Sequence, residues 1–218
     1  MSLLIYGIVE AGGIDMNGVG LDDNLRAVTE GQLMAVVRER SEPRIEPTAA
    51  ALGDFERTVR ALMDRAPILP AQFGSVLDDK AGVRDFLRQR SEDLLARLEQ
   101  VRGAVEIGLR ASWRDGGGVI PTERPKSGTS YLRDRLELRQ HARRVAHQLD
   151  PLTALALSSR RVIAPRPDLP VLDAYLVDRG RVDEFVALVE RLGGGLDDVD
   201  LVCTGPWPPY SFAEGAPI

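Results

Sequence analysis

The stretch Val105-Glu106-Ile107-Gly108-Leu109-Arg110-Ala111-Ser112-Trp113 shows the cleanest alternation of apolar and polar residues in this sequence of 218 residues. Successive side chains of a β-strand point to opposite faces, so the pattern predicts a strand with one buried and one exposed side. Around it, segments with the period of a strand alternate with segments that have the period of a helix. This mixture is typical of α+β proteins, in which helices cover a mostly antiparallel sheet.

Residues 1–114 are expected to form a first domain, with the element order β-β-β-α-β-α-β. A hairpin is indicated across Glu30-Gly31, between two runs with strand periodicity. Thr48 has the chemistry of an N-cap for the first helix. A second, single helix is expected after Asp78-Asp79, because an apolar stripe continues from there to Val101.

Residues 115–128 are rich in Gly and Pro and have no apolar period, so we expect an interdomain linker there. Residues 129–205 then read α-β-β-α-β. This order fits a split β-α-β, ferredoxin-like domain better than a doubly wound sheet. The predicted fold class is therefore α+β, with two small domains whose mixed or antiparallel sheets are covered by helices. The second domain is ferredoxin-like, and an extended Pro/aromatic tail follows at 206–218.

The tail gathers side chains that are scarce elsewhere, since the whole chain has only 2 Trp, 4 Tyr and 5 Phe. Proline fixes φ and removes a backbone donor, so the segment is expected to run as a stiff, polyproline-like ribbon. Such a ribbon packs either on its own chain, where it would join the two domains, or on a partner. The candidate interaction or interdomain residues are Pro206, Trp207, Pro208, Pro209, Tyr210 and Phe212.

Six ordered pieces of the sequence resemble the gas vesicle protein F/L family. They are LIYGIV at 4–9, LPAQFGSV at 69–76, VEIGL at 105–109, Ser127-Gly128 with Tyr131-Leu132, DAYLV at 173–177 and GPWPPYSF at 205–212. The resemblance implies a non-enzymatic accessory or minor structural protein of the gas vesicle, a hollow buoyancy organelle with a protein wall. It implies binding to the hydrophobic shell protein GvpA, and possible contacts with other gas vesicle accessory proteins, to assist nucleation or growth of the vesicle. It does not separate the F type from the L type.

Composition and charge exclude several classes of protein. The net charge is 28 minus 33, or −5, without a basic block, so no nucleic-acid partner is expected. No apolar run reaches the roughly 20 residues that a bilayer span requires. Cys203 is the single cysteine, which rules out an intramolecular disulfide. We expect a cytoplasmic protein that associates with the gas vesicle and has no membrane span.

We find no catalytic, cofactor-binding or metal-binding residues in the sequence patterns. His141 and His147 are about 120° apart around a helix, so they do not form an i, i+4 metal pair and are expected to be solvated. The glycines at 12–20 match neither dinucleotide nor phosphate-loop spacing. Two alternatives stay open: a small-molecule enzyme of the dimeric α+β barrel type, and a plain interaction scaffold.

Three arginines of the long helix expected after the linker, Arg135, Arg139 and Arg143, follow the spacing i, i+4, i+8. Such residues share one helix face, so they form a basic stripe. The stripe either contacts an acidic patch of a partner or is a solvated face paired locally with Asp134 and Glu137.

Overall fold

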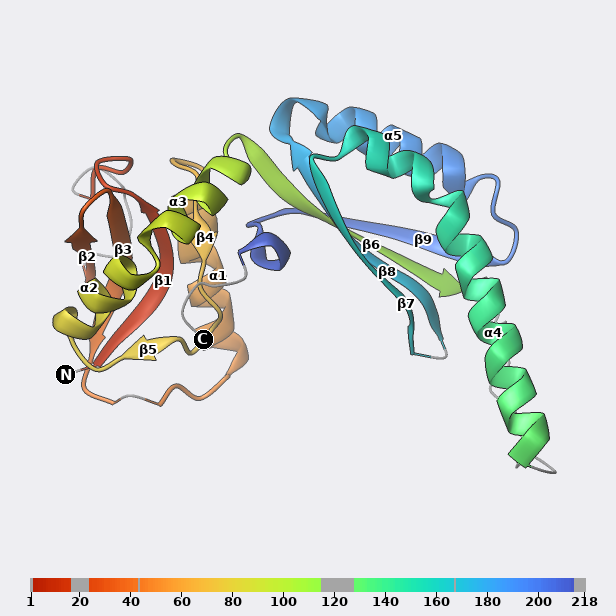
Figure 1. The fold of residues 1–218 in the computed structure, drawn as a ribbon, viewed down its shortest axis with the longest axis horizontal. Helices are drawn as coiled ribbons and strands as arrows, with labels where there is room; N and C mark the ends of the chain where they lie inside the picture. The colour runs from red at the N-terminus through yellow and green to blue at the C-terminus, as the bar shows by residue number, and fades with distance from the viewer. Residues whose placement is uncertain (1, 17–23, 43, 115–127, 167, 214–218) are drawn as a thin grey trace. The chain divides into compact units, whose positions relative to one another are not determined.

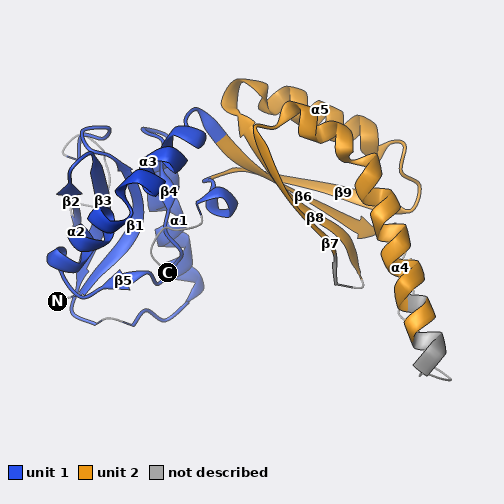
Figure 2. Cartoon of the chain, viewed as in Figure 1, with its two compact units in different colours: residues 1–104, 208–218 blue, residues 105–207 orange. Residues whose placement is uncertain are grey.

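The computed structural model describes every residue except 1, 17–23, 43, 115–127, 167 and 214–218. The chain divides into two compact units (Figure 2). Unit 1 comprises residues 1–104 and 208–218, and unit 2 comprises residues 105–207. The chain therefore leaves unit 1 once and returns to it after Trp207.

Unit 1 is built on an antiparallel sheet with β1 at its centre. The strands are β1 (Ser2–Glu10), β2 (Leu25–Glu30), β3 (Leu33–Arg40), β4 (Leu69–Pro70) and β5 (Val76–Leu77). Their order is β2-β3-β1-β4, and β5 also pairs with β1. The predicted hairpin is present, and it turns at Gly31, whose φ of 57° is one that glycine adopts without strain.

Helices cover both faces of this sheet. The residues of β1 from Ser2 to Val9 are all buried, so both alternating sets of side chains need cover. On one face lies α1 (Ala49–Met63), whose Phe55 stacks on Tyr6 with ring centroids 4.9 Å apart. The other face is crossed by α2 (Lys80–Gln89) and α3 (Ser91–Gln100), as Figure 1 shows.

Capping residues set the helix starts in unit 1. Thr48 and Asp79 each accept a hydrogen bond from a backbone amide three residues further along the chain. The single helix predicted after Asp79 is in fact two helices, because Arg90 has φ −115° and ψ 13°, outside the helical region. Glu92 and Asp93 then occupy the first turn of α3, where carboxylates stabilise a helix N-terminus.

Gly7 on β1 lies where Ile68 and the first residue of β4 come close to the backbone. A Cβ atom at this position would lie 2.6 Å from Cδ1 of Ile68 and 2.9 Å from the backbone oxygen of Leu69. The register of β1 against β3 also shifts between Ile5 and Gly7. The absence of a side chain at Gly7 therefore lets β4 pair with β1.

Unit 2 has the ferredoxin-like order β-α-β-β-α-β. Its main elements are β6 (Ala104–Trp113), α4 (Gly128–Gln148), β7 (Ser158–Arg166), β8 (Leu169–Asp178), α5 (Val182–Gly193) and β9 (Val199–Trp207). Two short 3-10 turns, η2 (Asp150–Leu155) and η3 (Arg179–Arg181), precede β7 and α5. The sheet order is β7-β8-β6-β9, so each helix connects two strands that have a third strand between them. The predicted α+β class, with a ferredoxin-like second part, is confirmed.

The strand β6 belongs to unit 2, whereas the sequence pattern assigned it to the first domain. It pairs with β9 from Glu106, opposite Trp207, to Trp113, opposite Val199. The boundary had been predicted from the Gly- and Pro-rich segment 115–128, of which residues 115–127 lie outside the described part of the chain. Composition marks a loop, but it does not tell which sheet the preceding strand joins.

The two faces of the unit 2 sheet differ in exposure. The apolar residues of β6, from Val105 to Trp113, are buried on the face that α4 and α5 cover (Figure 1). On the opposite face, Val162 and Leu172 lie directly across from each other and are 51% and 39% exposed. Val202 on β9 is 48% exposed. This second face is therefore partly apolar and open to solvent.

We expect Gly7→Ala to destabilise unit 1 by about 1–3 kcal/mol, because the added methyl group overlaps a side chain and a backbone oxygen. Urea or thermal unfolding measures the change. The matched control is Gly53→Ala in α1, where the nearest atom to a new Cβ is the flexible end of Arg57 at 3.5 Å and alanine favours the helix. Equal losses in the two variants would contradict the close approach at Gly7.

Candidate functional site

The predicted tail is divided between the two units. Pro206 and Trp207 are the last residues of β9, where Trp207 pairs with Glu106. From Pro208 onward the chain belongs to unit 1, in which it forms the short turn η4 (Tyr210–Phe212). The predicted residues are thus distributed over two environments.

Within unit 1 the tail buries its apolar side chains. Pro208 and Pro209 are buried, and only 3% of the surface of Phe212 is exposed. The hydroxyl of Tyr210 donates a hydrogen bond of 3.0 Å to Oε2 of Glu56 on α1. While these contacts hold, the side chains are not available to a partner, and a role of the tail in binding stays a prediction.

The predicted basic stripe lies on the exposed side of α4. Arg135, Arg139 and Arg143 are all exposed. Arg135 interacts with another residue, whereas Arg139 and Arg143 have no ion pair or hydrogen bond with the side chains that the structure describes. Pairing with Glu137 is therefore not seen for these two arginines, whereas the side chain of Asp134 lies outside the described part of the chain. Contact with a partner stays a prediction.

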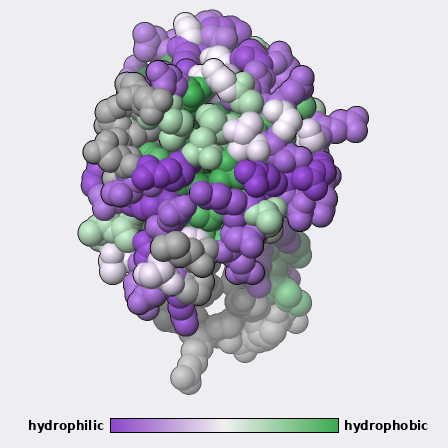
Figure 3. All heavy atoms as spheres, turned by 90° about the vertical axis from the view of Figure 1, so that its left-hand side faces the viewer, coloured by the Kyte–Doolittle hydropathy of each residue, from purple (hydrophilic) through white to green (hydrophobic). Residues whose placement is uncertain are grey.

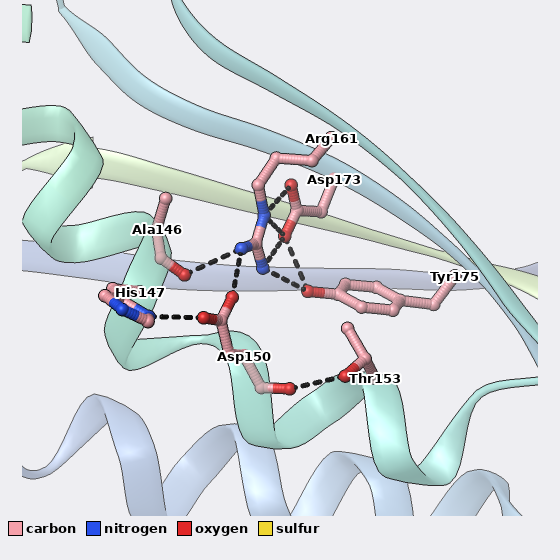
Figure 4. Close-up of polar contacts among 7 residues, drawn as sticks. All are labelled: Ala146, His147, Asp150, Thr153, Arg161, Asp173 and Tyr175. Atoms are coloured by element: carbon pink, nitrogen blue, oxygen red, sulfur yellow. Dashed lines mark hydrogen bonds and ion pairs between the residues drawn. The ribbon is translucent and has the colours of Figure 1, made fainter.

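A buried polar cluster in unit 2 joins α4 to the sheet (Figure 4). Arg161 on β7 lies opposite Asp173 on β8, and its Nε donates to both carboxylate oxygens, at 3.0 and 2.9 Å. Its Nη1 donates to Oδ1 of Asp150 at 2.6 Å and to the backbone oxygen of Ala146 at 2.8 Å. Its Nη2 donates at 3.1 Å to the hydroxyl of Tyr175, which donates to Asp173 at 2.5 Å.

Burial and pairing both shift the pKa values in this cluster. Burial alone would lower the pKa of Arg161, but its hydrogen bonds with Asp173 and Asp150 outweigh burial and raise that pKa. Burial, together with the hydrogen bond to Asp173, raises the pKa of Tyr175, so the phenol keeps its proton at neutral pH. The hydrogen bond from Arg161 lowers the pKa of Asp150. Asp150 therefore adds stability at neutral pH, which is lost as the pH falls through its folded pKa.

The cluster is suited to a structural role. Its arginine is paired with two carboxylates, and its tyrosine is a protonated donor rather than a base or nucleophile. Sequence reasoning missed it because Arg161 and Asp173 become neighbours only through the register of β7 and β8. The available signal was Asp173 itself, a carboxylate at an inward position of an otherwise apolar strand.

The two histidines have different surroundings. The side chain of His147 is 86% exposed and contacts Asp150, in agreement with the predicted solvated position. His141 is less exposed than expected: its ring lies 4.5 Å from that of Trp113, and its Nε2 lies 2.5 Å from Oδ2 of Asp198. Among the described residues, no group of three His, Cys, Asp or Glu side chains has the geometry of a metal site.

Apolar side chains are unevenly distributed over the surface. Among the residues the structure describes, the exposed large hydrophobic side chains are Leu52 in unit 1 and, in unit 2, Leu132, Leu136, Leu157, Val162, Leu172 and Val202. On the face of unit 1 seen in Figure 3, hydrophilic side chains surround a smaller apolar area. No helix in the described part of the chain is both long and apolar enough to cross a bilayer.

Known proteins similar to this chain are gas vesicle proteins. The family model described as gas vesicle synthesis protein GvpL/GvpF matches residues 2–214. Gas vesicle protein L of Streptomyces sp. (strain CB03234) is 32% identical over 200 residues, which cover 82% of this chain and 74% of that protein. Gas vesicle protein F2 of Halobacterium salinarum is 24% identical over 218 residues, which cover 97% of this chain and 92% of that protein.

Solved structures share the fold. The crystal structure of gas vesicle protein GvpF from Anabaena sp. PCC7120 matches with a TM-score of 0.80 at 17% identity, over 98% of this chain and 96% of that one. GvpF from Microcystis aeruginosa matches with a TM-score of 0.80 at 15% identity, over 98% of this chain and 99% of that one. At such identities the likeness concerns the fold alone.

Two α+β units, of which the second is ferredoxin-like, define the structural class of this protein. The match of the family model over nearly all of the sequence then shows to which family the chain belongs. The chain belongs to the GvpL/GvpF family of gas vesicle synthesis proteins. The resemblance drawn from the six sequence pieces is confirmed, and the family is one of gas vesicle proteins rather than of known enzymes.

We expect Arg161→Ala to destabilise unit 2 by about 3–5 kcal/mol, because it leaves the Asp173 carboxylate buried and unpaired. Thermal or urea unfolding measures the loss. The comparison is the triple variant Arg161→Met, Asp173→Leu, Tyr175→Phe, which removes the buried polar groups together and is expected to lose less. A triple variant that is less stable than Arg161→Ala would contradict this account of the cluster.

Replacing Phe212 by Ala is expected to destabilise unit 1 by about 3–5 kcal/mol, because the ring is almost fully buried there. Tyr210→Phe removes only the hydrogen bond to Glu56 and is expected to cost about 0.5–1.5 kcal/mol. Unfolding followed by circular dichroism ranks the two variants. A Phe212→Ala variant with unchanged stability would show that the tail does not pack on unit 1 in solution.

Proposed function

We propose that this chain is an accessory or minor structural protein of the gas vesicle, and that it binds the shell protein GvpA. It assists nucleation or growth of the vesicle in the cytoplasm. The observation that supports this most is the match of the GvpL/GvpF family model over residues 2–214. The names of the similar proteins place them in the same system, as gas vesicle proteins L and F.

A protein of this kind can limit the self-association of the shell subunit before assembly. A small, strongly apolar shell subunit associates with itself in water before it is assembled, because the burial of apolar surface is favourable and non-directional. A protein that shields part of this surface keeps the subunit available for growth of the wall. It needs accessible apolar side chains of its own on a stable frame.

Unit 2 has the larger share of such side chains. Val162 and Leu172 form an exposed cross-strand pair on the open face of its sheet, and Val202 lies on the edge strand β9 of the same sheet. In contrast, Pro208, Pro209 and Phe212 of the tail are buried within unit 1. We therefore assign the contact with GvpA to the open face of the unit 2 sheet.

Co-expression of GvpA with the tagged full chain tests the proposal. We expect the full chain to raise the amount of soluble GvpA and to retain it in a pull-down. The double variant Val162→Ser, Leu172→Ser is expected to lose most of this capture, because it removes the exposed apolar pair.

The matched control is Leu52→Ser, which changes an exposed apolar residue of unit 1 that is 43% exposed. It is expected to capture GvpA as the unchanged chain does. A well-folded full chain that captures no GvpA contradicts direct binding and favours the interaction scaffold. Equal capture by the full chain and the double variant contradicts the assigned face but not the binding.

A further inference from the structure

The exposed side of α4 carries a pattern that the proposed function does not use. Leu132 and Leu136 are 62% and 61% exposed, and Arg139 and Arg143 are exposed as well. The four positions follow a 4-3-4 spacing. At about 100° and 1.5 Å per residue they form one narrow stripe along roughly 16 Å of helix. We call Leu132, Leu136, Arg139 and Arg143 the α4 seam.

The α4 seam lies beside the face that holds the helix in unit 2. Ala142, Val145 and Ala146 are the buried residues on that face. Around the helix, Ala146 is about 20° from Arg139, and Ala142 and Val145 are about 60° or more from every residue of the seam. α4 packs on β7 and β8, and Figure 1 shows its N-terminal part continuing beyond these strands. The seam is therefore carried by a helix whose neighbouring face is anchored in the core.

The spacing and chemistry of the α4 seam point to a helix as its occupant. A 4-3-4 succession is the spacing of the side chains at a contact between two helices. Arginine at such a contact needs a carboxylate opposite it, and among the described residues Arg139 and Arg143 have none. We propose that the α4 seam binds an amphipathic helix of a partner protein, with apolar residues over Leu132 and Leu136 and carboxylates over the two arginines.

Charge complementarity selects this occupant over a second copy of the chain. Two seams packed in parallel would place arginine against arginine, and two antiparallel seams would place leucine against arginine. The seam itself contains no carboxylate that could pair with the arginines of another copy. A lipid surface would need a broader apolar face than two leucines provide. An acidic amphipathic helix complements both halves of the seam.

The test uses synthetic helical peptides with four stripe positions at 4-3-4 spacing. One peptide carries Leu at the first two positions and Glu at the last two, and a second peptide has the reverse order. Matched peptides carry Lys in place of each Glu. By fluorescence anisotropy, we expect the full chain to bind one of the Glu peptides more tightly than its Lys counterpart. The variant Arg139→Glu, Arg143→Glu is expected to weaken binding of this Glu peptide by about tenfold or more and to strengthen binding of the Lys peptide.

The control variant is Arg133→Glu, Arg144→Glu. It changes the net charge equally at two exposed positions of α4 that lie off the seam. We expect it to bind the Glu peptide within about threefold of the unchanged chain. Equal losses in the two double variants, or equal affinity for Glu and Lys peptides, overturn the proposal. So does binding to vesicles of anionic lipid without binding to any peptide. Because no shell protein is present, failure here leaves the GvpA experiment unaffected.

Discussion

The pairing of β6 with β9 is the constraint on which much of the structure depends. It joins segments far apart in the chain, as in the hydrogen bond of 3.4 Å from Thr204 to the oxygen of Gly108, 96 residues away. It completes the order β7-β8-β6-β9, and it sets the point at which the chain returns to unit 1. Gly205, with φ of 122°, lies so close to the oxygen of Glu106 that a Cβ would be 2.8 Å away. The sheet thus relies on a backbone that only glycine adopts easily.

The helix α4 combines a fixed end with an exposed end. Near its C-terminus, Arg161 joins the backbone of Ala146 to a carboxylate of the sheet, and the pairing keeps buried charge satisfied. Toward its N-terminus, Leu132 and Leu136 face solvent. Because the base of the helix is anchored, its backbone is ordered before a partner binds, which lowers the entropy cost of binding.

The sequence predicts local features well, because they depend on neighbouring residues. The alternation at 105–113 predicts a strand. The side chains of Thr48 and Asp79 accept hydrogen bonds from nearby backbone amides and so determine where two helices begin. The assignment of that strand to a sheet depends on residues 199–207, which composition does not reveal. The cluster around Arg161 depends on strand register, and a slip by one residue would send the side chain to the other face. The basic stripe follows from helical spacing alone, whereas the exposure of Leu132 depends on where α4 passes the end of the strands.

We propose that this member of the GvpL/GvpF family meets the gas vesicle shell protein through apolar side chains on the open face of the unit 2 sheet. Amide hydrogen exchange of the full chain, alone and co-purified with GvpA, tests this most directly. We predict slower exchange in β7 and β8 of the complex and unchanged exchange in α1. Unchanged exchange in β7 and β8 of a verified complex would contradict it.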